Sequence, residues 1–156
     1  MKDDYLNFYN NLIKLTTNKS LYKDLTIEQD TFSDRLSLFL FHFAFILKEF
    51  KNKENEKKLQ ELYDFNFRQL ELSIREIGYG DQSINKKMKN YINVFHGLIS
   101  EIHFWDKISM SEKKKCLYKF LPNFRNNDNL LSYFEDFSLN LKKYNLNSYL
   151  KSVKNL

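Results

Sequence analysis

The scarcity of turn-forming residues is the feature that most constrains how this chain can fold. Its 156 residues include three glycines and one proline. Strands joined by short hairpins rely on such residues at their turns, whereas helices joined by a few loops need far fewer of them. Hydrophobic residues make up 42% of the chain and charged residues 29%, which is the balance of a globular protein with a buried core. We therefore expect an all-α fold, a single compact domain over residues 1–156 with about six helices around an aromatic-rich core.

Two helices are predicted in the first third of the chain. In residues 3–17, the apolar side chains that share one helical face are Tyr5, Leu6, Tyr9, Leu12 and Ile13. Residues 32–50, with Thr31 or Ser33 as the N-cap, are apolar nearly all round, which indicates a central buried helix or a partner-binding groove. The uncharged stretch 36–47 is about 18 Å long as a helix. A membrane span needs about 20 apolar residues, so the pattern does not favour one.

Two further helices flank a glycine-containing turn at residues 78–82. The apolar residues that recur at helical spacing before the turn are Leu59, Leu62, Tyr63, Phe67, Leu70, Ile74 and Ile77. Those that recur after it are Ile84, Met88, Tyr91, Ile92, Phe95, Leu98, Ile99 and Ile102. We expect Gly78 to end the first of these helices as its C-terminal cap and Ser83 to cap the second.

The last third of the chain has weaker signals. Ser109 and Glu112 predict a capping box for a short helix that Pro122 stops. Asn127 or Asp128 is expected to cap a last long helix. The tail after it, LNSYLKSVKNL, is predicted to add a turn or to fray.

The sequence offers little for catalysis. His96 and His103 are two helical turns apart, about 10.5 Å, so these two cannot share one metal ion whose ligands lie at about 2 Å. Cys116 follows three lysines that would lower the pKa of its thiol, but no base can be assigned to it and a small buried apolar role is favoured. No nucleotide-binding or hydrolase motif occurs. We therefore predict no enzyme activity and no catalytic, cofactor-binding or metal-binding residue. A helical enzyme would require His42 and Cys116 to converge in a pocket.

A cluster of three lysines, Lys86, Lys87 and Lys89, follows the glycine-containing turn in a chain of net charge +5. Such a cluster is either a solvated helix face or a surface for an anionic partner, such as RNA or a membrane. The abundance of lysine, asparagine, isoleucine, phenylalanine and tyrosine, whose codons are AT-rich, accounts for the basic character equally well.

Two blocks of residues together carry a resemblance to a known family. The block around the turn and along the basic helix consists of Arg75, Glu76, Ile77, Gly78, Gly80, Asp81, Lys86, Lys87, Met88, Lys89, Phe95 and Gly97. The upstream block consists of Asp30, Thr31, Arg35 and His42. In this order and spacing they resemble the motifs of the ubiquinol–cytochrome c chaperone family, assembly factors of the cytochrome bc1 complex. The resemblance covers about residues 21–105. The chain differs from the family pattern at Gln82, which is usually hydrophobic, and at His96 and Leu98, where a Tyr-Gly-Arg ending is common.

The resemblance implies an α-helical, non-catalytic chaperone without a cofactor. Its client would be newly made cytochrome b, and further partners would be the ribosome, the inner-membrane surface and a small helical protein, with no small-molecule substrate. The location implied is the cytoplasmic side of the inner membrane in a bacterium, because the start of the chain has no presequence, or the matrix side for a processed mitochondrial form. The residues of the two blocks are the predicted partner-binding or motif positions.

Two predictions about the partner-binding surface follow. The aromatic-rich helix at 32–50 would present a groove to transmembrane segments of the client, a role that full burial of Phe39, Phe41, Phe43 and Phe45 would exclude. The lysine cluster would contact an acidic loop, a ribosome or anionic lipid. The alternative function is a basic helical module that binds RNA or the ribosome, with strongly salt-dependent affinity.

Overall fold

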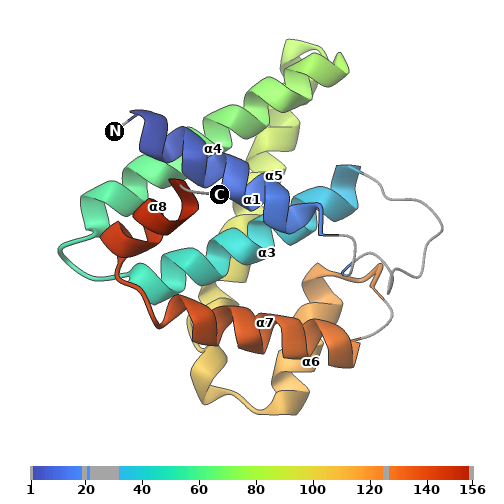
Figure 1. Cartoon of the computed structure of the whole chain (residues 1–156). Helices are drawn as coiled ribbons and strands as arrows, with labels where there is room; N and C mark the ends of the chain where they lie inside the picture. Colours follow the sequence, from blue (N-terminus) through green and yellow to red (C-terminus); the bar gives the residue numbers. More distant parts are fainter. Residues whose placement is uncertain (1, 19–20, 22–31, 125–126, 155–156) are drawn as a thin grey trace.

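The computed structural model describes residues 2–18, 21, 32–124 and 127–154. These residues form seven α-helices, a short 3₁₀-helix and no strand (Figure 1). The elements are α1 (Lys2–Thr16), α3 (Phe32–Phe50), α4 (Glu56–Ile77), α5 (Asp81–Ile102), η1 (Trp105–Lys107), α6 (Met110–Phe120), α7 (Asn127–Leu141) and α8 (Leu146–Lys154). The predicted all-α fold is confirmed. Residues 19–20 and 22–31, which include the predicted motif residues Asp30 and Thr31, lie outside the described residues.

Helix α3 is the centre of the molecule, where it contacts α1, α5 and α7. Its side chains are buried around most of the helix, as its apolar sequence predicts. Phe41, Phe43 and Phe45 have no exposed surface and Phe39 is 6% exposed. The prediction that this helix forms the client groove is therefore wrong, because the same phenylalanines already pack against the neighbouring helices.

Aromatic contacts join α3 to three other elements. Phe43 stacks on Phe95 of α5 at a ring-centroid distance of 5.4 Å, and Phe45 stacks on Phe134 of α7 at 5.4 Å. The indole of Trp105 in η1 meets Phe45 edge-on at 5.1 Å. Rings in such offset and edge-on arrangements contribute about 0.5–1.5 kcal/mol per pair beyond their burial. The aromatic-rich core predicted from the sequence is thus present.

The C-terminal tail departs from its prediction, since it forms the nine-residue helix α8. Asn145 and Ser148 build a reciprocal cap: the Asn145 side-chain oxygen accepts from the Ser148 amide at 2.8 Å, and the Ser148 hydroxyl accepts from the Asn145 amide at 3.0 Å. Leu146, Tyr149, Leu150 and Val153 are buried. Capping and burial together stabilise as a full helix a segment that was predicted to add a turn or to fray.

Helix α1 is rotated relative to the predicted face. Phe8 and Leu12 are fully buried, whereas Leu6 and Ile13 are exposed. Helix α1 packs against both α3 and α8: the Asn11 side-chain amide donates to the Tyr149 hydroxyl at 3.0 Å, and Phe8 meets the rings of Tyr149 and Phe43 edge-on.

Gly78, Ser109 and Pro122 mark helix ends as predicted, whereas α7 already begins at Asn127, so Asn127 and Asp128 lie within it and do not precede it as a cap. The Ser109 hydroxyl accepts from the Glu112 amide at 3.2 Å and caps α6. Gly78 caps the C-terminus of α4. Ser83, however, does not cap α5, which begins two residues earlier at Asp81 with Gly80 as its N-cap. Within the described part of the chain, no helix combines the length and the apolar character that crossing a bilayer requires.

Candidate interaction site on the α4–α5 hairpin

Helices α4 and α5 form a long hairpin whose turn lies at the far end of the molecule from α6 and α7 (Figure 1). Gly78 has a φ of 103°, which side-chain-bearing residues rarely adopt, and its amide donates to the Arg75 carbonyl at 3.0 Å. Gly80 is extended, and its carbonyl accepts from the Ile84 amide at 3.0 Å to start α5. We call residues 77–81 the hairpin turn.

Arg75 connects the two helices at the hairpin turn. Its guanidinium donates to Asp81 at 2.7 Å and to Glu71 at 3.2 Å. The hydrogen bond to Asp81 is the main cause that raises the pKa of Arg75, and the bond to Glu71 adds to it. Asp81 also lies in the first turn of α5, where a negative charge is favoured by the helix dipole. Three of the predicted motif residues, Arg75, Gly78 and Asp81, therefore build the turn itself.

The surface around the turn combines apolar and basic groups. Ile77 is 54% exposed, although the sequence predicted it on the packed face of α4, and Tyr79 is 44% exposed. The ammonium of Lys87 lies 4.5 Å from the centre of the Tyr79 ring, a cation–π contact. Lys86 and Lys89 are exposed. Exposed apolar side chains beside cations suit binding to another macromolecule, and none of these groups has a partner that would make it a nucleophile or a base.

A groove with a volume of about 840 Å³ runs along the hairpin between α4 and α5. Its apolar lining is Tyr63, Phe67, Leu72, Met88 and Ile92, and its polar and charged lining is Asp64, Arg68, Glu71, Arg75, Asn85, Lys89 and Asn93. Of these, Arg75 and Lys89 were predicted as site residues.

The other two predicted residues of α5 separate from the turn. Phe95 is 14 residues after Asp81, or about 21 Å along the helix. It is fully buried, lies 5.3 Å from Phe67 between ring centres, and anchors α5 to α3 and α4. Gly97 is exposed, and a Cβ there would meet no atom within 4 Å.

The two positions that depart from the family pattern have structural contacts. Leu98 is buried in the core, at 2% exposure. The His96 ring nitrogen Nε2 lies 3.0 Å from the Tyr63 hydroxyl, which links α5 to α4 at the base of the hairpin.

The upstream motif residues lie elsewhere. His42 is fully buried, where Nδ1–H donates to the Leu38 carbonyl at 2.7 Å and Nε2 accepts from the Tyr133 hydroxyl at 2.6 Å. Burial lowers the pKa of His42 to about 4, against the opposing hydrogen bond to Leu38. Neutral His42 is thus a hydrogen-bonded core residue that joins α3 to α7.

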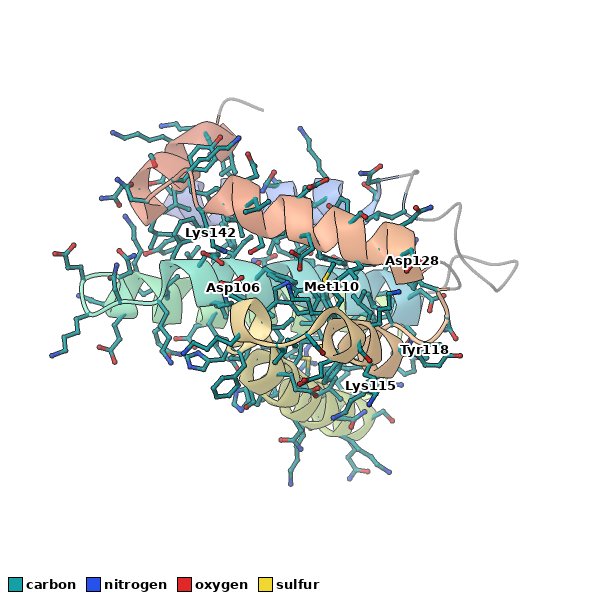
Figure 2. The ribbon with its side chains drawn as sticks, turned by 90° about the horizontal axis from the view of Figure 1, so that it is seen from below. Asp106, Met110, Lys115, Tyr118, Asp128 and Lys142 are labelled. Atoms are coloured by element: carbon teal, nitrogen blue, oxygen red, sulfur yellow. The ribbon has the colours of Figure 1, made fainter. Side chains whose placement is uncertain are left out.

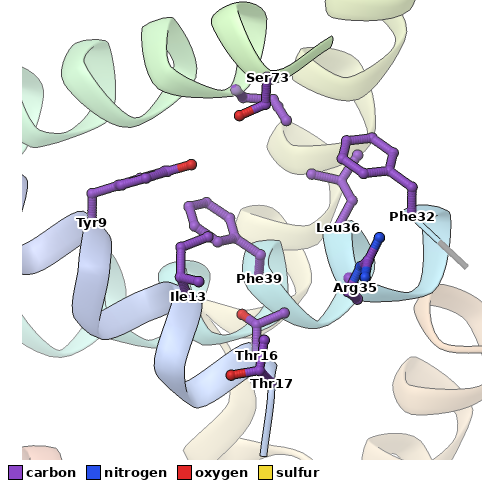
Figure 3. Close-up of a pocket in the computed structure, with 10 residues that line it drawn as sticks. Tyr9, Ile13, Thr16, Thr17, Phe32, Arg35, Leu36, Phe39 and Ser73 are labelled. Atoms are coloured by element: carbon purple, nitrogen blue, oxygen red, sulfur yellow. The ribbon is translucent and has the colours of Figure 1, made fainter. Parts of the chain in front are cut away.

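Arg35 is exposed at the start of α3 and lines a second, smaller pocket of about 270 Å³ between α1, α3 and α4 (Figure 3). This pocket is mainly apolar, with Ile13, Leu36 and Phe39 among its lining residues. Arg35 therefore does not join the hairpin turn, and Asp30 and Thr31 lie outside the described residues.

The pKa of the single cysteine is shifted in the direction opposite to the one predicted from the neighbouring lysines. Burial, together with a smaller contribution from Glu101, raises the pKa of the Cys116 thiol to about 12. The preceding lysines do not point at the thiol: Lys113 pairs with Glu135 at 2.7 Å and Lys114 with Asp128 at 2.7 Å. Among the described residues, no three His, Cys, Asp or Glu side chains gather to hold a metal ion.

The fold and the hairpin define an all-helical protein whose exposed features suit macromolecular binding. Residues 28–103 match the family model described as Ubiquinol-cytochrome C chaperone. The match spans α3, α4 and α5 and includes both motif blocks, so the family predicted from those motifs is confirmed over this segment. No curated protein and no solved structure matches the chain significantly.

Several residues of the hairpin surface were missed as site residues in the sequence. Tyr79 lies within the turn predicted at residues 78–82, and Leu72 lies off the apolar face predicted for α4. Arg68 belongs to a run of alternating charge, Asp64, Arg68, Glu71 and Arg75. That alternation at helical spacing is the signal that could have indicated a second, charged face of α4.

Proposed function

We propose that this protein is a non-catalytic chaperone for assembly of the ubiquinol–cytochrome c reductase (bc1) complex, and that its client is newly made cytochrome b. The family match over residues 28–103 is the observation that carries the proposal. On this proposal the chain acts as one helical domain at the cytoplasmic side of the inner membrane, or on the matrix side in a mitochondrion.

The hairpin turn is the client-binding surface in this proposal, in place of α3. Ile77 and Tyr79 offer apolar surface, whose burial contributes about 25 cal/mol per Å². Lys86 and Lys87 lie beside them and complement acidic loops or anionic lipid headgroups near the client. The motif residues Arg75, Gly78 and Asp81 keep this surface in place, because they fix the geometry of the turn.

A deletion strain complemented by variants tests the proposal. We expect the strain to lose spectroscopic cytochrome b and assembled bc1 complex, and the wild-type gene to restore both. The variant Lys86→Glu, Lys87→Glu, Lys89→Glu should restore them poorly while keeping its unfolding temperature. Normal cytochrome b in the deletion strain would overturn the proposed function.

A matched control comes from α6, which carries Lys115 and the exposed ring of Tyr118 on the face seen in Figure 2. The double variant Lys115→Glu, Tyr118→Ser makes on α6 the same two changes that Lys87→Glu, Tyr79→Ser makes at the hairpin turn. It should restore bc1 assembly fully. Equal loss with both sets of changes would show that overall charge, not the hairpin turn, is what matters.

Binding of RNA or the ribosome remains the competing function for the same lysines. Lys86 and Lys89 form no ion pair within the described part of the chain, which leaves them available to phosphates. Affinity for RNA would then fall steeply with salt, because each neutralised phosphate releases counterions. A binding curve that does not respond to salt, or no binding, removes this function.

A further inference from the structure

The groove between α4 and α5 has the dimensions of a site for a single helix. Its lining on α4 runs from Tyr63 to Arg75, about 18 Å or roughly three helical turns. Contacts between the two helices bracket it at both ends. The Tyr63–His96 contact lies at the base, and the Arg75–Asp81 ion pair lies at the turn.

The floor of the groove is apolar and partly uncovered. Phe67 is buried beneath it, while Met88 and Ile92 are half-buried and Leu72 is 46% exposed. An amphipathic helix laid in a groove buries such side chains through residues three and four positions apart. Leu72 is the most exposed apolar residue of the lining, so it has the most surface to bury under a bound helix.

The two edges of the groove differ in charge. The α5 edge carries Lys89 between two asparagines, Asn85 and Asn93, and no acidic residue. The α4 edge alternates between Asp64, Arg68, Glu71 and Arg75. Arg75 is neutralised by its ion pairs with Glu71 and Asp81, whereas Arg68 and Lys89 form none among the residues that the structure describes. The available cations therefore exceed the available anions.

We propose that this groove binds an amphipathic helix of about three turns, with an apolar stripe against the floor and acidic residues along the side that faces Lys89. The occupant is another protein. This inference rests on the proposed function, because it names the kind of partner segment that the chaperone hairpin takes. It adds a second contact surface to the hairpin turn and gives the partner a defined chemistry.

The experiment measures binding of a fluorescein-labelled, hydrocarbon-stapled helical peptide of about four turns to the full-length protein. The peptide carries leucines on one face and glutamates along one flank, and a second peptide has lysines in place of the glutamates. We expect saturable binding of the acidic peptide, with affinity on the order of tenfold above that of the basic one. Higher salt should reduce the difference.

Matched variants locate the site. Lys89→Glu should lower the affinity for the acidic peptide on the order of tenfold, whereas Lys115→Glu on α6 should leave that affinity unchanged. Leu72→Gln should weaken it as well, whereas Leu139→Gln on α7, another exposed leucine, should leave it unchanged. Methyl resonances of Met88 and Ile92 should shift on titration. Melting curves for all four variants show that each remains folded.

Several outcomes would overturn the inference. These are equal binding of the two peptides, equal weakening by the groove and control variants, no saturable binding, and binding of an RNA oligonucleotide to the groove instead of the peptide. If the peptide does not bind but the deletion strain has a bc1 defect, only the groove assignment is overturned. If the peptide binds in the groove but the deletion strain assembles a normal bc1 complex, only the proposed function is overturned.

Discussion

The base and the turn of the α4–α5 hairpin are made by the same two helices, yet they present opposite surfaces. At the base, Phe67, Phe95 and Leu98 are buried, and Phe95 packs against Phe67 and against Phe43 of α3. At the turn, Ile77 and Tyr79 are about half exposed and stand beside lysines. Stability is therefore expected to depend on the base and binding on the turn, so substitutions should separate the two properties along one pair of helices.

The largest effect is expected for Phe95→Ala at the base. The ring contacts Phe43, Phe67 and Tyr63, so its removal leaves a cavity between three helices. Large-to-small changes of this kind cost about 3–5 kcal/mol. Urea unfolding followed by circular dichroism should show a free energy of unfolding lower by that amount. The exposed Phe104 is the matched control, and Phe104→Ala should cost less than about 1 kcal/mol. A comparable loss of unfolding free energy for both variants would contradict the assignment of stability to the base of the hairpin.

The next largest effect concerns pH and the buried His42. Its pKa is lowered to about 4 in the folded protein, against about 6.5 when unfolded. Between these values the unfolded chain binds a proton that the folded chain does not, so stability falls as pH decreases from 6.5 towards 4. The loss approaches about 3 kcal/mol over this window. Unfolding free energies measured from pH 7 to 4 should show this slope.

The variant His42→Gln isolates that contribution, because other groups titrate in the same range. It should be less stable than the wild type at pH 7, since the bonds to Leu38 and Tyr133 are altered. The difference between the two proteins should then shrink as pH falls. A difference that stays constant with pH would mean that the pKa of His42 is the same in the folded and the unfolded protein.

At the turn, Gly78→Ala is expected to have a smaller effect on stability. The backbone φ of 103° strains any residue with a side chain, at a cost of about 1–2 kcal/mol. Because the strain lies in the turn, the variant should also lower client binding and bc1 assembly more than its loss of stability explains. Gly80→Ser is the control, since Gly80 is the N-cap of α5 with a φ of −72°, serine is favoured at that position, and a Cβ there meets no atom within 4 Å. Equal losses for both variants would show that the left-handed conformation at Gly78 is not the cause.

The sequence was sufficient for the parts of the fold that depend on local patterns. Continuous apolar spacing located α3, α4 and α5, and Ser109 and Gly78 marked helix ends. The face of α1 could not be predicted, because it is set by contacts with Phe43 of α3 and Tyr149 of α8, which are distant in the sequence. Local sequence signals therefore predict where a helix begins and ends. They do not predict which face of a helix is buried when that face is set by residues distant in the sequence.

The same distinction explains the candidate site. The turn from Arg75 to Asp81 was visible as a motif because its residues are close in sequence. The groove was not, since it depends on the register of α4 against α5, which the Tyr63–His96 and Phe67–Phe95 contacts determine. Phe95 belongs to the same motif but stabilises the base, so a motif alone does not distinguish binding residues from packing residues.

The smallest effect, and the only gain in stability, is expected for Gly97→Ala on the exposed side of α5. Glycine in a helix interior costs about 0.5–1 kcal/mol relative to alanine, and a Cβ at this position meets no atom within 4 Å. The variant should unfold at higher urea concentration by an amount that matches this free energy. Because nothing within the described chain requires a glycine there, lower bc1 assembly by this more stable variant would mean that a partner approaches α5 closely at Gly97. A loss of stability would instead mean that the α5 surface at Gly97 is packed in the free protein.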